Sequence, residues 1–90
     1  GSTGQPKGVG IAHAALAGHI DATIRYARLT PSDRVLQFST VNFDGFVEQL
    51  FPPLCLGATV VMRGPDLWTT DEFVARVARH GLTVAHLPTA

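Results

Sequence analysis

Residues 58–62, ATVVM, form an uninterrupted run of apolar and mostly β-branched side chains. Such a run is typical of a strand buried on both faces, as the strands of parallel sheets are. Helix-like patterns flank the run on both sides. Strands that are joined through helices pair in parallel, so this stretch predicts a parallel sheet with helical crossovers.

The rest of the chain alternates between helical periodicity and short strand candidates. In the helical segments, apolar residues recur at steps of three and four. The second helix contains Pro52 and Pro53, and we expect a kink or break there because proline removes a backbone hydrogen bond and clashes with the preceding turn. The expected elements are a helix over 13–28, a strand over 34–39, a helix over 45–56, the strand over 58–62, a helix between Thr69 and Gly81 and a strand over 83–87. The order indicates an α/β protein with a mainly parallel sheet.

The third helix carries the strongest local signals. Thr69 and Glu72 have the spacing of a capping box, in which each side chain accepts a hydrogen bond from the other residue's backbone amide. Trp68 and Phe73 are spaced as a hydrophobic staple around the same helix start. Gly81 suits the left-handed residue that ends a helix. We therefore expect this helix to begin and end at defined residues.

Composition excludes several classes of protein. The 90 residues carry seven basic and seven acidic side chains, so the chain lacks the basic surface that nucleic acids and anionic membranes attract. No apolar run is long enough to cross a bilayer. Cys55 is the only cysteine, which excludes an intrachain disulfide and a cysteine-based zinc site. We expect a cytoplasmic protein without nucleic-acid or membrane partners and without a metal site built by the chain.

The first eight residues, GSTGQPKG, form a glycine-rich loop. Its glycines let the backbone bend until several amides point at one ligand, while its hydroxyls and lysine add donors and a positive charge. This combination suits a polyphosphate, and the residues concerned are Gly1, Ser2, Thr3, Gly4, Lys7 and Gly8. A Walker A loop needs Ser or Thr after the lysine, so this is not a standard P-loop. On glycine content alone, a solvated turn is an equal alternative.

Three stretches of the chain resemble the adenylate-forming enzymes in the family's own order. GSTGQPKGV resembles their phosphate loop, whose common form is TSGSTGxPKGV. FDGFVEQLFPPLCLGATVVM resembles the next motif, an aromatic-Asp pair that leads a helix into a GAT strand, and LTVAHLPTA resembles the strand that follows. Within the family, the chain looks most like the amino-acid adenylation domain of nonribosomal peptide synthetases.

The resemblance implies that residues 1–90 are a partial adenylation domain, a slice of the large N-terminal core. Such enzymes use ATP and Mg²⁺ to convert an amino acid into an aminoacyl adenylate. They then load it onto the phosphopantetheine thiol of a peptidyl carrier protein. The glycine loop would bind the ATP phosphates, with Lys7 as the catalytic cation. The slice lacks the family's adenine, ribose and lid-lysine motifs, so we expect it to be inactive by itself.

The same resemblance assigns roles around the second motif. Asp44 would bind the α-ammonium group of the substrate, and Phe43 would gate the tunnel for the pantetheine arm. The alternatives are a helix N-cap for Asp44 and an ordinary apolar anchor for Phe43. The family's specificity positions fall on Gly45, Glu48 and His86.

Glu48 raises the question of substrate charge. It lies one helical turn after Asp44, so both carboxylates share a helix face. A buried carboxylate needs a partner, and we expect either His86 or a cationic substrate side chain, which favours a basic amino acid. The alternatives are a solvent-exposed Glu48 and a His86 that is hydrogen-bonded in the core. His19 is expected on the surface.

Two other interpretations of the whole chain remain. One is a fragment of an acyl- or aryl-acid CoA ligase, although such enzymes generally lack an aspartate at the position of Asp44. The other is a non-catalytic module that retains the fold.

Overall fold

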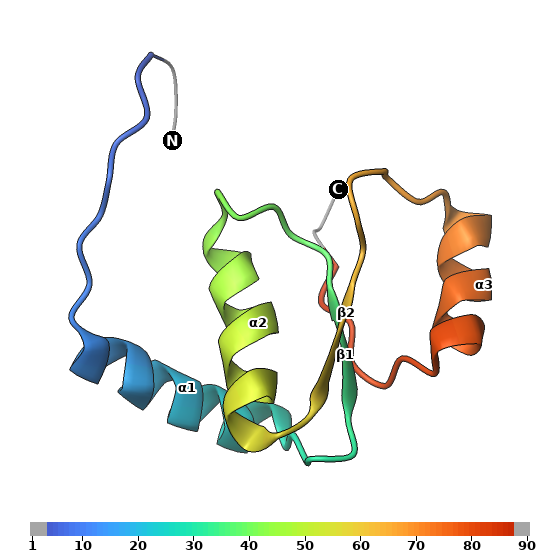
Figure 1. Ribbon diagram of the computed structural model, residues 1–90, viewed down its shortest axis with the longest axis horizontal. Coiled ribbons are helices and arrows are strands. Elements are labelled where there is room, and N and C mark those ends of the chain that lie inside the picture. Colours follow the sequence, from blue (N-terminus) through green and yellow to red (C-terminus); the bar gives the residue numbers. More distant parts are fainter. Residues whose placement is uncertain (1–3, 88–90) are drawn as a thin grey trace.

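The computed structural model describes residues 4–87. Its elements, in chain order, are α1 (His13–Ala27), β1 (Arg34–Gln37), α2 (Asp44–Leu56), β2 (Thr59–Met62) and α3 (Thr70–His80). The two strands pair in parallel, and α2 is the crossover between them. Figure 1 shows α1 and α2 on one side of the strands and α3 on the other. The expected α/β architecture with parallel strands is confirmed.

The core of the described chain is centred on β1. Val35 and Leu36 are 2% and 0% exposed. In β2, Val60 and Val61 are half-buried and the terminal residues are exposed, so the prediction of a strand buried on both faces is wrong for the described chain. Among residues 4–87, β1 is the one strand that pairs with β2, so β2 is an edge strand whose other side stays open to solvent. No helix among residues 4–87 has both the length and the apolar character that a bilayer span requires.

The expected strand over 83–87 is reduced to a single bridge. Val84 pairs in parallel with Val35, and its carbonyl accepts a hydrogen bond from the amide of Leu36 at 2.9 Å. β1 is therefore hydrogen-bonded both to β2 and to the segment around Val84, which explains why it is the most buried strand. Residues 88–90 lie outside the described part of the chain.

A kink or a break was expected at the two prolines of α2; the helix runs through both without interruption, so the break is wrong. Pro52 and Pro53 are both fully buried. Burial of the two rings offsets the backbone hydrogen bonds that proline cannot donate. The helix ends at Gly57, whose φ of 83° lies in the left-handed region that glycine tolerates.

The local signals of α3 are confirmed. The side chain of Thr69 accepts from the amide of Glu72 at 3.1 Å, and the Glu72 carboxylate accepts from the amide of Thr69 at 3.3 Å. The Trp68 and Phe73 rings lie 6.4 Å apart between centroids, as a staple requires. The helix ends at Gly81 with φ 61°.

A polar brace holds the amino end of β1. The hydroxyl of Thr83 donates to Asp33 Oδ1 at 2.7 Å and accepts from the amide of Arg34 at 2.8 Å. Arg34 Nε donates to the carbonyl of His80 at 2.6 Å, which ties the end of α3 to the strand. Hydrogen bonds from the Thr30 amide and from Thr83 lower the pKa of the Asp33 carboxyl.

Candidate functional site

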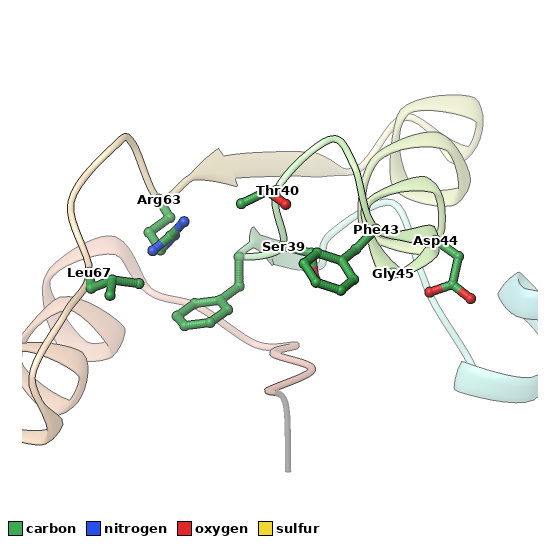
Figure 2. Close-up of a pocket in the computed structure, with 8 residues that line it drawn as sticks. Ser39, Thr40, Phe43, Asp44, Gly45, Arg63 and Leu67 are labelled. Atoms are coloured by element: carbon green, nitrogen blue, oxygen red, sulfur yellow. The ribbon is translucent and has the colours of Figure 1, made fainter. Parts of the chain in front are cut away.

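The carboxyl ends of β1 and β2 and the first turn of α2 lie at the same end of the molecule (Figure 1). Ligands of open α/β sheets bind at this edge. A pocket of about 260 Å³ opens there, which we call the edge pocket (Figure 2). It is lined by Phe38, Ser39, Thr40, Phe43, Asp44, Gly45, Arg63 and Leu67.

Asp44 is the first residue of α2, and Phe43 occupies the N-cap position without a side-chain hydrogen bond. The alternative role of Asp44 as an N-cap is therefore wrong. Its carboxylate is exposed and forms no ion pair within residues 4–87. It stands at the positive end of the helix dipole, where a negative charge is stabilising.

Asp44 lines the edge pocket, and Figure 2 shows its carboxylate on the side of α2 that faces away from Arg63 and Leu67. It also lines a second pocket of about 260 Å³ together with His19 and Glu48, so it offers an accessible negative charge between the two pockets.

Phe43 is 66% exposed. Figure 2 shows its ring within the edge pocket, between the first turn of α2 and the side of the pocket that carries Arg63. A buried apolar anchor would be enclosed, whereas this ring stands open to solvent. Its role as a gate stays a prediction.

Gly45 permits a close approach between α2 and the end of β1. A Cβ atom at this position would lie 3.0 Å from Ser39 Oγ, too close without a shift of that side chain. Next to this contact is Gln49, which is 3% exposed and was not singled out from the sequence. Its one sequence signal is a polar residue among the apolar ones of α2.

Arg63 is a second residue that sequence reasoning missed. Its guanidinium carbon lies 4.8 Å from the centroid of the Phe38 ring, a cation–π geometry. One of its terminal nitrogens donates to the carbonyl of Asp66 at 3.3 Å. Arg63 therefore places a positive charge on the wall of the edge pocket opposite the first turn of α2 (Figure 2).

Glu48 contacts His19, and not His86, which was one of the two partners expected for it. Glu48 Oε1 lies 3.3 Å from His19 Nε2, and their side chains are 49% and 47% exposed. The expected burial of Glu48 is therefore wrong, because the carboxylate faces a solvated space between α1 and α2. His86 does line this space, a pocket of about 320 Å³, together with both residues. The sequence could not show this contact, since it depends on how the two helices pack.

The described part of the glycine loop, residues 4–8, is exposed, and Gly4 has φ 91°. Lys7 forms no ion pair within residues 4–87. Gly1, Ser2 and Thr3 lie outside the described residues. In Figure 1 the segment that precedes α1 rises toward the end of the molecule that carries the edge pocket. An exposed glycine-containing backbone with one ammonium group fits a polyphosphate chemically.

Comparison with known proteins assigns the family. The model of the AMP-binding enzyme family matches residues 1–90. The chain belongs to this family. The resemblance read from the three motifs is thereby confirmed, and the edge pocket is a feature of an AMP-binding enzyme core.

Several relatives of this AMP-binding enzyme chain are peptide synthases. It is 48% identical over 94 residues to an isonitrile lipopeptide synthase from Streptomyces coeruleorubidus, a match over 100% of this chain and 6% of that protein. It is 38% identical over 87 residues to a linear gramicidin synthase from Brevibacillus parabrevis, over 97% of this chain and 1% of the relative. It is also 38% identical over 84 residues to a PKS-NRPS hybrid synthetase from Aspergillus niger, a match over 92% of this chain and 4% of that protein. The chain thus spans a small part of each relative.

Proposed function

We propose that the chain is part of an amino-acid adenylation domain. The full protein would activate an amino acid with ATP and pass the aminoacyl group to the phosphopantetheine thiol of a carrier protein. The match to AMP-binding enzymes and the similarity to peptide synthases support this assignment. The observation that carries it is Asp44, an exposed carboxylate at the rim of the edge pocket. A carboxylate in this place favours a substrate with an ammonium group.

The reaction is mainly a problem of positioning and charge. The substrate carboxylate attacks the α-phosphorus of ATP, and pyrophosphate leaves. Asp44 would bind the α-ammonium group and orient the carboxylate, which brings the reacting atoms together. Lys7 and the amides of the glycine loop would hold the departing phosphates. Mg²⁺ would come with the nucleotide phosphates, as is usual for this ion.

The second half-reaction needs a path for the thiol. Phe43 stands open at the N-cap of α2 and lines the edge pocket. We propose that this ring moves aside when the pantetheine arm of the carrier protein enters. We also propose a weak preference for a basic amino acid, because Glu48 presents a half-exposed carboxylate to the pocket that His86 also lines.

Amino-acid-dependent pyrophosphate exchange by the full-length protein tests the proposal. We expect exchange with at least one amino acid, and at least about tenfold lower kcat/KM with the corresponding acid that lacks the amine. We expect Lys7→Ala to raise the KM for ATP without changing the KM for the amino acid, and Arg79→Ala, on α3, to change neither. Exchange driven only by amine-free acids would instead support an acyl- or aryl-acid ligase. Absence of exchange with either class would support a non-catalytic module.

A further inference from the structure

Gln49 uses its entire hydrogen-bonding capacity while being 3% exposed. Its Oε1 accepts from the amides of Phe38 and Ser39 at 2.8 and 2.9 Å. Its Nε2 donates to Ser39 Oγ at 3.1 Å and to the carbonyl of His86 at 3.4 Å. A primary amide has two acceptor sites and two donor hydrogens, so all four are engaged. Burial of such a group is favourable only when its partners stay in place.

These contacts lie where the sheet ends. The ladder between the strands closes with the amide of Arg63 bonded to the carbonyl of Gln37 at 3.0 Å. Beyond that point, Gln49 rather than a strand satisfies the next two amides of the chain. The same side chain reaches His86, which follows the Val84 bridge. At the carboxyl edge of the sheet, Gln49 therefore makes the hydrogen bonds that a neighbouring strand would otherwise make. It also connects the end of β1 to the segment around His86.

Gln49 also connects that edge to the proposed substrate contact. It lies on α2 within two turns of Asp44, and Gly45 packs against Ser39 within the same contact. A shift of this side chain would move Ser39, which lines the edge pocket, relative to the first turn of α2. Apolar residues would fill the same volume, but they would not fix this relative position.

We propose that Gln49 is a positioning residue, which sets where the amino-acid substrate lies against Asp44 by holding the end of β1, the start of α2 and His86 in one arrangement. The kinetic part of this inference rests on the proposed function. The structural part, the connection between the two segments, does not.

Two variants of the full-length protein separate these contacts. Gln49→Leu removes every hydrogen bond. Gln49→Glu keeps the acceptor for the Phe38 and Ser39 amides but leaves an acceptor facing the carbonyl of His86. Thr83→Val is the matched control, because Thr83 makes the corresponding polar brace at the opposite end of β1.

Pyrophosphate exchange gives the kinetic readout. We expect Gln49→Leu to raise the KM for the amino acid about tenfold, equivalent to about 1.4 kcal/mol, and to leave the KM for ATP within about twofold. We expect Gln49→Glu to lie between this variant and the parent, and Thr83→Val to change neither KM. A purely structural role would lower the active fraction, and thus kcat, with both KM values unchanged. That result, or an equal rise in both KM values, would overturn the proposal.

Hydrogen exchange gives a readout that does not depend on activity. We expect the Phe38 and Ser39 amides to exchange faster in Gln49→Leu and to stay protected in Gln49→Glu. Unchanged exchange in Gln49→Leu would overturn the connection itself. If the parent protein activates no amino acid, the proposed function fails. Hydrogen exchange at the Phe38 and Ser39 amides still decides whether Gln49 connects the two chain segments at this edge.

Discussion

At the scale of single residues, the carboxylates of the chain differ in what surrounds them. Asp33 accepts hydrogen bonds from Thr30 and Thr83, which lower its pKa. Asp44 stands exposed at the rim of a pocket, and Glu48 contacts His19 in a solvated space. The first is a structural group, whereas the other two face volumes large enough for a ligand.

The contact of Glu48 with solvent limits how strongly it can select a basic substrate. An ion pair that is about half exposed contributes about 1 kcal/mol or less, so we expect about fivefold discrimination. Glu48→Gln in the full-length protein should therefore lower the ratio of kcat/KM for lysine or ornithine over leucine by about this factor. Glu72→Gln, a change in the cap of α3, is the matched control. A parent that prefers leucine or phenylalanine to every diamino acid would contradict the prediction.

The pKa of Asp33 predicts a pH dependence of stability. Because the folded state lowers this pKa, the unfolded chain binds the proton more readily, and stability falls with decreasing pH. The contribution is fully present above the ordinary carboxyl pKa and is lost as pH falls through the lowered value. We expect Asp33→Asn to have a lower Tm than the parent at pH 6. At pH 3 the difference in Tm between the two proteins should be smaller. Thermal unfolding at both values measures this, and a difference independent of pH would contradict it.

At the scale of elements, a prediction was correct or wrong according to how close in the sequence the residues behind it lie. The cap and staple of α3 involve residues a few positions apart, and both were predicted correctly. The burial of β2 and the continuity of α2 through its prolines depend on what packs against them, and the predicted burial of β2 and the predicted break in α2 were wrong. The same reason explains which site residues could be predicted. Asp44 was predicted from a motif of neighbouring residues, whereas Gln49 and His19 contact residues that are distant in the sequence.

The cap of α3 gives an element-scale prediction. Thr69→Ala removes the acceptor for the amide of Glu72, and loss of such a cap costs about 1 kcal/mol. Thr70→Ala, one residue into the helix, should change stability much less, because alanine is a good helix former. Urea unfolding of the two variants and the parent compares them. Equal destabilisation by both changes would show that the capping box is not formed.

At the scale of the whole molecule, the described chain encloses few side chains and exposes many apolar ones. Apart from the rings of Pro52 and Pro53, Val35 and Leu36 are the only buried apolar side chains among residues 4–87. Large apolar residues that are at least 48% exposed are Val9, Ile11, Tyr26, Val41, Phe43, Leu54, Met62, Leu67, Val74 and Leu87. Exposed apolar surface of this extent favours association.

We therefore expect residues 1–90, when expressed alone, to self-associate and to unfold over a broad temperature range. Sedimentation velocity and thermal circular dichroism measure the two properties. A soluble monomer with a sharp two-state transition would contradict this expectation.

We propose that Asp44 recognises the ammonium group of an amino-acid substrate. The most direct test is a thermodynamic cycle in the full-length protein, in which one residue and one substrate group are changed separately and together and pyrophosphate exchange is measured. Parent and Asp44→Asn are each compared on the preferred amino acid and its amine-free analogue, with Asp71→Asn, a change in the first turn of α3, as control. We predict that removing the amine lowers kcat/KM at least about tenfold in the parent and in the control, and much less in Asp44→Asn. An equal loss in all three proteins would contradict the claim.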